Sequence, residues 1–411
     1  MKILVLNSGS SSQKACLFEI GETLPDRAAI PLWEGRIEWC GDTAAIFVKN
    51  SKGVTFKEEL RLCSRGQVIR HLIRSAFEGE ASVIASATEI DAVGHRVVHG
   101  GPHFEEPVVL TEEVRAAIES VSAFAPLHIR AELEGMKIVE DFLGSVAQVA
   151  VFDTGFHRQM PLSAAVYPGP YEWFETGIRR YGFHGINHQY CAERAAQMLT
   201  ANVKDLKIVS CHLGNGCSVT AIREGRSIDT TMGFTPLEGL MMGTRSGSVD
   251  PGILTYVMRK NQLDAQGIDE LLNSKSGLLG VSGLSSDMRD ILAAVRQGHE
   301  RAKLAFEIYM HRLQAAIGGM AAVLGGMDVL VFTAGVGENS AEVRSAACNG
   351  LEFLGVRLNE QANARSSRDQ DISTPESRVR VLVIRAGEDW AIAKECWNLA
   401  ESGRSQYSAA T

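Results

Sequence analysis

The chain contains Ile3-Leu-Val-Leu-Asn-Ser-Gly-Ser-Ser-Ser-Gln-Lys-Ala-Cys-Leu-Phe-Glu19 and, 205 positions later, Ile208-Val-Ser-Cys-His-Leu-Gly-Asn-Gly-Cys-Ser-Val-Thr-Ala-Ile-Arg-Glu224. Each stretch reads as a strand, a turn of small polar residues and a second strand. Aligned without a gap, Ile3 meets Ile208, Gly9 meets Gly214 and Glu19 meets Glu224. The offset is too long for a solenoid repeat. Three identities are few, and by themselves they only suggest a duplicated domain.

The composition is that of an ordinary globular protein. The 411 residues are 45% hydrophobic and 22% charged, which argues against disorder. The length predicts two or three domains. With 41 Lys and Arg against 49 Asp and Glu, the net charge is −8, which argues against a dedicated nucleic-acid binder.

No segment reads as an export signal or a membrane span. The apolar run Ile3–Leu6 is shorter than a signal core, and Ala315–Met327 is too short to cross a bilayer. The eight cysteines form no Cys-x-x-Cys pair and read as reduced thiols of a cytosolic protein. We therefore expect a cytoplasmic protein with no membrane or nucleic-acid partner.

Short apolar runs alternate with amphipathic stretches, which predicts an α/β fold. The expected strands are Ile3–Leu6, Ala15–Ile20, Ala92–Val98, Val146–Phe152, Ile208–Cys211, Ser218–Ile222, Val329–Thr333 and Val379–Ile384. The expected helices are Glu112–Ser122, Arg130–Leu143, His188–Leu199, Asp287–Gln297, Arg301–Leu324 and Ala341–Leu351.

Three Gly- and Ser-rich turns are candidate phosphate sites. Asn7–Lys14 offers hydroxyls, backbone N–H groups and one Lys, the donors that a phosphate needs, although it also reads as an ordinary polar hairpin. Cys211–Gly216 is similar, but Asn-Gly is also the commonest hairpin turn. Val331–Ser340 runs from a buried strand through a Gly-rich turn into a helix, whose N-terminus suits a nucleotide.

Several well-known motifs are absent. There is no Gly-x-Gly-x-x-Gly in the third turn and no Gly-Lys of a P-loop, so P-loop kinases fit poorly. The protein-kinase signature and the Gly-x-Ser-x-Gly of serine hydrolases are also missing. His95, His99 and His103 lie four apart, but Gly100-Gly-Pro102 disfavours the helix that a shared zinc face would need. A strand followed by a loop fits better, with Arg96 directed to solvent or to an anion.

Two further regions of the sequence are more typical of a functional site than of a purely structural segment. Arg179-Arg-Tyr-Gly-Phe-His-Gly185 gathers two cations, two aromatic rings and a histidine, although a lone His is more often structural. Asp229–Gly247 and Ser276–Asp290 are Gly-rich and lack periodicity, and long irregular stretches in compact chains are usually functional. Ser285-Ser-Asp287 could also simply cap the next helix.

Seven motifs of this sequence match the motifs of one known protein family. They are Asn7-Ser-Gly-Ser-Ser-Ser12, Gly94-His-Arg-Val-Val-His-Gly-Gly101, Phe152-Asp-Thr-Gly-Phe-His157, Arg180-Tyr-Gly-Phe-His-Gly185, His212-Leu-Gly-Asn-Gly216, Met232-Gly-Phe-Thr-Pro-Leu-Glu-Gly-Leu-Met-Met-Gly-Thr-Arg-Ser-Gly247 and Phe332-Thr-Ala-Gly-Val-Gly-Glu-Asn339. Over essentially its whole length the chain resembles the acetate kinases of the acetokinase family, within the sugar kinase, heat-shock chaperone and actin superfamily.

The resemblance implies two duplicated ribonuclease-H-like domains with an active-site cleft between them, which gives the offset of 205 a meaning. It places residues 1–153 and 388–411 in an N-terminal domain with the first phosphate hairpin. Residues 154–387 form a C-terminal domain with the second hairpin and the adenosine loop. Family members are typically homodimers.

The implied reaction is reversible phosphoryl transfer from ATP to acetate, giving ADP and acetyl phosphate, with Mg²⁺ or alternatively Mn²⁺. Four residues match the family's catalytic positions: Arg96, Asp153, His184 and Arg245. Of the two arginines, one would bind the substrate carboxylate and the other the phosphoryl group. His184 would hydrogen-bond the phosphoryl group, Asp153 would orient metal or substrate, and Asn7 and Glu388 would lie near the metal.

The resemblance also assigns two groups of binding residues. The acyl pocket, in addition to Arg96, maps onto Val98, Leu127, Phe183 and Pro236. The nucleotide side maps onto Asn7, Ser10, Ser12, Lys14, His212, Gly214, Asn215, Gly216, Asp287, Met288, Arg289, Gly335, Val336, Gly337, Glu338 and Asn339.

Six residues depart from the usual family pattern: Ile129, Arg130, Ile186, Asn187, Ser248 and Gly387. Ile129 and Ile186 lie beside residues of the expected acyl pocket, so the choice of acid is open. The alternatives are a propionate or butyrate kinase of the same family, an ATPase of the chaperone or actin kind, and a non-catalytic binding protein. The intact catalytic set argues against the last two.

Overall fold

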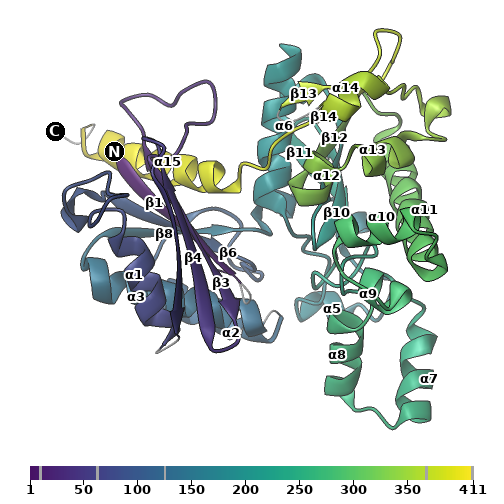
Figure 1. Cartoon of the computed structure of the whole chain (residues 1–411), viewed down its shortest axis with the longest axis horizontal. Helices are drawn as coiled ribbons and strands as arrows, with labels where there is room; N and C mark the ends of the chain where they lie inside the picture. The colour runs from purple at the N-terminus through teal and green to yellow at the C-terminus, as the bar shows by residue number, and fades with distance from the viewer. Residues whose placement is uncertain (9–11, 62–63, 125, 366–368, 409–411) are drawn as a thin grey trace. The chain divides into compact units, whose positions relative to one another are not determined.

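The computed structural model describes residues 1–8, 12–61, 64–124, 126–365 and 369–408. The chain divides into two compact units (Figure 1). Unit 1 consists of Met1–Gly155 and Gly387–Thr411, and unit 2 consists of Phe156–Ala386.

Unit 1 is built on an eight-stranded mixed sheet. Its strands are β1 (Lys2–Ser8), β2 (Ser12–Glu19), β3 (Trp33–Cys40), β4 (Thr43–Asn50), β5 (Thr55–Arg61), β6 (Ala92–Val97), β7 (Val108–Val109) and β8 (Ala147–Phe152). They lie in the order β5-β4-β3-β2-β1-β6-β8-β7. β1 to β5 form an antiparallel meander, whereas β1, β6 and β8 are parallel.

Helices cover both faces of this sheet. They are α1 (Arg65–Arg74), α2 (Glu112–Ser120), α3 (Pro126–Leu143) and α15 (Glu388–Ser408), with short 3₁₀ turns at Ala87–Glu89 and Ser122–Phe124. Leu4 and Leu6 share a core cluster with Val68 of α1 and Ile138 of α3. Because side chains alternate along a strand, Ile3 and Val5 face the other side, where α15 packs against β1 and β6.

Unit 2 is built on a six-stranded sheet. Its strands are β9 (Lys207–Leu213), β10 (Cys217–Arg223), β11 (Arg226–Thr230), β12 (Val329–Thr333), β13 (Gln370–Asp371) and β14 (Arg380–Val383), in the order β11-β10-β9-β12-β14-β13. The helices are α4 (Leu162–Ala165), α5 (Glu172–Glu175), α6 (Gly185–Leu199), α7 (Pro251–Asn261), α8 (Ala265–Ser274), α9 (Gly277–Ser282), α10 (Met288–Arg296), α11 (Glu300–Leu324), α12 (Ala334–Asn339), α13 (Ala341–Cys348) and α14 (Glu360–Arg365). α6 packs on β9 and β12, and α11 packs on β9, β10 and β11.

The two sheets repeat one five-stranded pattern. β3-β2-β1-β6-β8 in unit 1 corresponds to β11-β10-β9-β12-β14 in unit 2. In both, the first three strands are antiparallel and the last three are parallel. This is the strand order of a ribonuclease-H-like core, so the predicted α/β fold with a duplicated core is confirmed.

The gapless alignment of the two hairpins needs one correction. Ser8 pairs with Gln13, whereas Leu213 pairs with Cys217, so the second hairpin closes over one residue fewer. Lys14 lies opposite Asn7, and Ser218 lies opposite His212. The first strands therefore match at an offset of 205 and the second strands at 204, and the identity of Glu19 with Glu224 is not structural.

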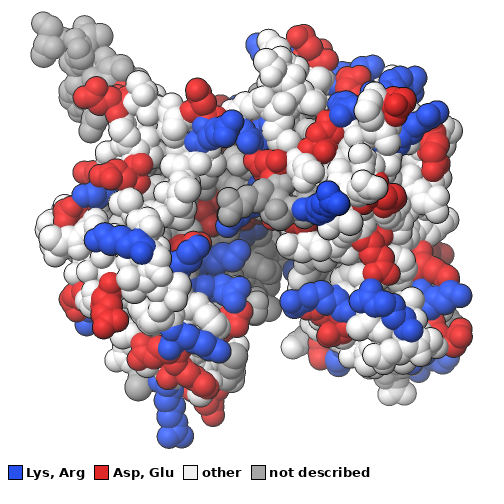
Figure 2. Space-filling view, turned by 45° about the horizontal axis from the view of Figure 1, so that its top comes forward, with Lys and Arg blue, Asp and Glu red and all other residues white. Residues whose placement is uncertain are grey.

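All the expected strands and helices are present, with ends displaced by a few residues. The elements that were not predicted from the sequence are β3, β4, β5, β7, β11, β13, α1, α4, α5, α7, α8, α9, α14 and α15. Among the described helices, none combines the length and the apolar composition that a membrane span requires. Six cysteines whose side chains the structure describes (Cys16, Cys191, Cys211, Cys217, Cys348 and Cys396) are buried and form no disulfide bond. On the face drawn in Figure 2, acidic and basic side chains are interspersed on each unit.

Candidate active site

Arg96 and Asp153 form a buried ion pair in unit 1. They lie at the carboxyl ends of the parallel neighbours β6 and β8, where side chains of adjacent strands meet. Arg96 Nη2 donates to Asp153 Oδ2 at 2.8 Å, and the Asp153 side chain is fully buried. Burial alone would lower the pKa of Arg96, but the charges of Asp153, Glu388 and Glu132 raise it above its ordinary value. Arg96 is therefore a permanent cation among carboxylates.

Glu132 of α3 is a buried carboxyl group that the sequence reading did not single out. The Val98 backbone N–H donates to both of its oxygens, at 3.1 and 3.2 Å. Burial raises the pKa of Glu132 to about 8, against the opposing effects of Arg96 and the Val98 N–H. The sequence feature that could have pointed to Glu132 is a carboxylate on the apolar face of the predicted helix Arg130–Leu143. Glu132 thus supports the backbone directly after Arg96.

The expected metal residues meet in unit 1. Asn7 at the end of β1 donates from Nδ2 to Glu388 Oε2 at 3.3 Å, and Glu388 begins α15. Burial raises the pKa values of Glu388 and of Asp389, and the charge of Lys14 opposes both shifts. Among the described residues, no group of three His, Cys, Asp or Glu is arranged to hold a metal. The candidate donor set is therefore one amide and one carboxylate.

Five further residues of unit 1 were expected to bind the nucleotide or the acid, and the structure describes some of them. Ser10 and the Leu127 side chain lie outside the described residues. Ser12 begins β2, and the exposed Lys14 follows on the same strand. Val98 is buried directly after β6. Lys14 is thus the exposed cation of the first hairpin.

His184 is held in an unusual backbone conformation in unit 2. It precedes α6 with φ 58° and ψ 22°, in the left-handed region that non-glycine residues rarely occupy. A Cβ added to Gly216 would lie 3.5 Å from His184 Nε2 and 3.4 Å from Arg245 Nη1. His184 and Arg245 therefore both adjoin the turn of the second hairpin.

Arg245 lies in the long irregular stretch between β11 and α7. Its Nη1 donates to the Pro236 carbonyl at 3.3 Å, and burial lowers its pKa. Among the described residues it forms no ion pair, unlike Arg96. Phe183, expected in the acyl pocket, is buried directly before His184. Unit 2 thus brings His184, Arg245 and Pro236 to one region.

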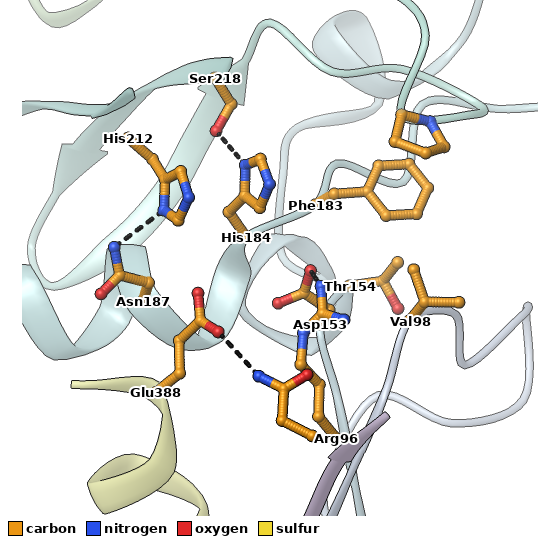
Figure 3. Close-up of polar contacts among 12 residues, drawn as sticks. Arg96, Val98, Asp153, Thr154, Phe183, His184, Asn187, His212, Ser218 and Glu388 are labelled. Carbon is orange, nitrogen blue, oxygen red and sulfur yellow. Dashed lines mark hydrogen bonds and ion pairs between the residues drawn. The ribbon is translucent and has the colours of Figure 1, made fainter. Parts of the chain in front are cut away.

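A histidine network surrounds His184 (Figure 3). His184 Nδ1 lies 2.9 Å from Ser218 Oγ, and its ring stacks on His212 at 3.8 Å between centroids. Asn187 Nδ2 lies 2.9 Å from His212 Nδ1. Ser218 Oγ also lies 2.8 Å from His188 Nε2, which joins β10 to α6. Neither residue was predicted as a site residue, because no sequence motif marks this contact.

The cluster Arg179–Gly185 has a partly structural role. Arg180 Nη1 donates to the carbonyls of Thr230, Thr231 and Met232, and Nη2 donates to Glu238 at 2.8 Å. Arg180 therefore anchors the irregular stretch that carries Arg245. The Gly243 N–H donates to the Asn215 carbonyl at 3.0 Å, which joins the same stretch to the second hairpin.

The remaining residues expected on the nucleotide side lie on two short elements of unit 2, α10 and α12. Asp287 caps α10 by accepting from the Arg289 N–H at 2.8 Å, as the capping alternative predicted, and it also pairs with the exposed Arg289 side chain. Met288 is buried. Gly335, Val336, Gly337, Glu338 and Asn339 do not form a turn before a helix, because they lie within the short helix α12, which α13 follows. The Glu338 side chain accepts from the Ala386 N–H at 2.8 Å and so ties α12 to the end of unit 2.

Most of the residues that depart from the family pattern are buried or form hydrogen bonds within their unit. Ile129 and Ile186 are buried on α3 and α6. Asn187 is buried and bonded to His212, whereas Arg130 is exposed. Ser248 accepts from the Gly239 N–H at 3.1 Å, and Gly387 is the first residue of the returning segment of unit 1.

Known proteins are similar to this chain in sequence and in fold. An acetate kinase of Cyanothece sp. is 55% identical over 98% of this chain and 99% of its own length. The crystal structure of Porphyromonas gingivalis acetate kinase is 41% identical with a TM-score of 0.89, over 97% of this chain and 99% of its own. A Francisella tularensis propionate kinase is 37% identical with a TM-score of 0.87, over 96% of this chain and 98% of its own. The family model matches residues 2–394, and the chain belongs to the acetokinase family.

Proposed function

We propose that the protein is an acetate kinase, which reversibly transfers the γ-phosphoryl group of ATP to acetate and gives ADP and acetyl phosphate. The observation that carries this proposal is the pair of half-buried arginines, one in each unit. Arg96 lies on β6, two residues before Val98, and Arg245 lies beside His184 and the second hairpin. The full-length likeness to relatives named acetate kinase supports the same reaction.

The reaction demands positioning of charges more than proton transfer. Acetate has a pKa of about 4–5, like a side-chain carboxyl group, so the nucleophile is already ionised at pH 7. The obstacle is to bring this anion up to a polyanion. Arginines lower the obstacle because the planar guanidinium binds carboxylate and phosphoryl oxygens in a fork. The attack is proposed to be in line and direct, with no covalent enzyme intermediate.

The two arginines suit different anions. Arg245 forms no ion pair among the described residues, so its charge is available to the phosphoryl group. Arg96 is already paired with Asp153 and adjoins Val98, which suits the carboxylate of acetate. His184 would hydrogen-bond the phosphoryl group during transfer, and Asp153 would orient Arg96.

Asn7 and Glu388 fit a magnesium ion, with manganese as an alternative. Mg²⁺ prefers oxygen donors, keeps several waters and uses one or two carboxylates together with phosphate oxygens. The amide and carboxyl groups, 3.3 Å apart, supply such donors. When bound, the ion would neutralise charge on the phosphates of ATP.

The residues proposed to bind the nucleotide lie on the first hairpin in unit 1, and on the second hairpin and α12 in unit 2. The first hairpin offers Asn7, Ser10, Ser12 and Lys14, and the second offers His212, Gly214, Asn215 and Gly216. The adenosine would contact Asp287, Met288 and Arg289 together with Gly335, Val336, Gly337, Glu338 and Asn339. Gly335 and Asn339 are exposed, as a ligand contact in this region needs.

A second candidate is a kinase for propionate or butyrate. It is favoured by the likeness to a propionate kinase and by Ile129 and Ile186 beside the expected acyl-pocket residues Leu127 and Phe183. One extra methylene changes binding in an apolar pocket by only about 1–3 kcal/mol. The choice therefore needs rates with each acid.

We also infer a homodimer that acts in the cytoplasm, as the family resemblance and the free thiols suggest. The test of the function is kcat/KM for acetate, propionate and butyrate with Mg-ATP, with acyl phosphate trapped as hydroxamate. Acetate is expected to give the highest value. A higher value for propionate or butyrate would make the second candidate correct.

A further inference from the structure

A buried chain of alternating serine and histidine side chains ends at His184. Ser210 Oγ lies 2.9 Å from His188 Nδ1, and His188 Nε2 lies 2.8 Å from Ser218 Oγ. Ser218 Oγ lies 2.9 Å from His184 Nδ1. Ser210, His188 and Ser218 have no exposed surface. Three elements build this chain: β9 supplies Ser210, α6 supplies His188 and β10 supplies Ser218.

Each hydroxyl and each neutral imidazole carries one hydrogen to donate, so the chain has only two consistent directions. Burial, with smaller effects from His157 and His212, lowers the pKa of His188 well below its usual value, so this imidazole is neutral. In one direction Ser210 donates to His188, His188 to Ser218, and Ser218 to His184. In the other direction every donation is reversed.

The reversed direction leaves a buried hydrogen without an acceptor. If His188 Nδ1–H donated to Ser210, the Ser210 hydroxyl hydrogen would need another partner. Among the described residues, His188 is the one side-chain partner of the Ser210 hydroxyl. An unsatisfied buried donor costs about 1–3 kcal/mol. The forward direction is therefore favoured, and it makes His184 Nδ1 an acceptor.

His212 receives a hydrogen bond on the same ring position. The Cys191 thiol lies 3.8 Å from Asn187 Oδ1, which leaves the Asn187 amide nitrogen as the donor. This Nδ2 lies 2.9 Å from His212 Nδ1 and 3.3 Å from Thr333 Oγ1. His212 Nδ1 is thus also an acceptor, and its ring is nearly parallel to that of His184, with an interplanar angle of 4°.

The opposite edges of both rings adjoin the second hairpin. An added Cβ would lie 3.5 Å from His184 Nε2 at Gly216 and 4.0 Å from His212 Nε2 at Gly214. Figure 3 draws the two imidazoles side by side, each with its Nδ1 bond to a separate neighbour. If each Nε2 carries the ring proton, each is a hydrogen-bond donor next to the turn of the second hairpin. In the proposed function, this turn binds phosphate.

We propose that Ser210, His188 and Ser218 are positioning residues that hold His184 as the neutral tautomer with its proton on Nε2, and that Asn187 does the same for His212. The paired imidazoles then present two N–H donors at Gly214 and Gly216. This inference rests on the proposed function for the identity of the acceptor, a phosphoryl or phosphate oxygen, but the tautomers themselves are independent of it.

The test is NMR of the full-length protein labelled with ¹⁵N and ¹³C in histidine, because ring nitrogen shifts distinguish Nε2–H from Nδ1–H. Wild type is expected to show Nε2–H for His184, His188 and His212. An Nδ1–H signal for His184 or His188 in the wild type would overturn the serine–histidine chain, and one for His212 would overturn the role of Asn187. Neither result depends on enzymatic activity.

Variants of Ser218 connect the tautomer to the rate. Ser218→Ala is expected to give His184 a mixture of tautomers and to lower kcat about tenfold, the scale of other residues that orient a reacting ligand. KM for acetate and ATP is expected to change little. Ser218→Thr, which keeps the hydroxyl, is expected to restore the single tautomer and the rate.

Thr220→Ala is the matched control. Thr220 lies two residues along β10, is equally buried, and bonds to Thr230 at 2.8 Å instead of to a histidine. It is expected to leave the tautomers and kcat unchanged. If Ser218→Ala matched this control in both readouts, the proposal would be wrong. If wild type formed no acyl phosphate at all, the proposed function would fail while the tautomer assignment could still stand.

Discussion

At the scale of single residues, the two arginines differ in what surrounds them. Arg96 is paired with a carboxylate, whereas Arg245 is buried against a carbonyl and the Met242 sulfur. An unneutralised buried cation is costly in the free protein and becomes favourable when an anion binds. This contrast makes Arg245 the more sensitive probe of phosphoryl transfer.

We predict that Arg245→Lys lowers kcat/KM for acetate by about 10²–10³, because an ammonium group keeps the charge but loses the fork of donors. Initial rates of hydroxamate formation measure this. Arg259→Lys, at an exposed position on α7, is the control and is expected to retain full activity. Equal activity of the two variants would remove Arg245 from the proposed mechanism.

A second residue-scale prediction concerns Glu132. Its pKa of about 8 in the folded protein lies above the usual 4.5, so the folded state binds the extra proton between these values. Stability from this group is therefore fully present below pH 4.5 and is lost as pH rises to about 8. Each pH unit in that window changes the free energy of unfolding by about 1.4 kcal/mol.

Glu132→Gln removes this titration while keeping an oxygen that can accept from the Val98 N–H. Wild type is expected to become steadily less stable relative to the variant from pH 5 to pH 8, as measured by urea unfolding at each pH. A stability difference that stays constant over this range would show that Glu132 is ionised throughout it.

At the scale of elements, α15 packs closely on the sheet of unit 1. An added Cβ at Gly94 of β6 would lie 2.5 Å from Ile392 Cγ2 and 2.7 Å from Cys396 Sγ on α15. The absence of a side chain at Gly94 thus sets how near the helix can approach. The same helix begins at Glu388, so its seating also places a proposed metal residue.

We predict that Gly94→Ala destabilises the protein by about 1–3 kcal/mol, the usual cost of overpacking. Its control is Gly21→Ala in the same unit, where an added Cβ would meet nothing within 4 Å. Thermal and urea unfolding measure both. A Gly94 variant as stable as the Gly21 variant would contradict the close packing of α15.

The strands predicted from the sequence have continuous apolar runs, whereas two of the missed strands, β3 and β5, alternate. β4 was missed although it contains the apolar run of residues 44–48. β1, β9 and β12 are buried on both faces and were found. β3 and β5 alternate buried or half-buried residues with exposed charged ones such as Arg36 and Lys57, so they offer no apolar run. The helix α7, which was also missed, buries none of its residues.

The candidate site was predictable only where a motif carries it. Arg96, Asp153, His184 and Arg245 belong to family motifs, whereas Ser218 and Glu132 act through contacts that the chain makes only when folded. Periodicity cannot show that a serine on β10 meets a histidine on α6. The slipped register of the second hairpin was likewise set by pairing, which a gapless alignment ignores.

At the scale of the whole molecule, the duplicated core explains why the two hairpins proposed to bind phosphate have the same arrangement of strands. Each is a β-hairpin at the centre of its sheet, with parallel strands beside it. Asn7 in unit 1 occupies the position of His212 in unit 2, and Lys14 occupies that of Ser218. The duplicated fold therefore carries Lys14 and the proposed metal residues in unit 1 and the histidine network in unit 2.

A whole-molecule prediction concerns assembly. α7 buries none of its residues, and Ile253 and Tyr256 are 48% and 61% exposed. We predict a homodimer with about twice the chain mass of 44.5 kDa in light scattering. Tyr256→Glu is expected to weaken the dimer if α7 contributes to the contact. A monomeric wild type would contradict the prediction.

The most direct test of the central claim is to count ADP and acyl phosphate in one reaction containing Mg-ATP and acetate, and again without acid. One acetyl phosphate is expected for each ADP, and almost no ADP is expected without acetate. ADP that forms at the same rate without acid, and without any acyl phosphate, would contradict the kinase and support an ATPase of the chaperone or actin kind.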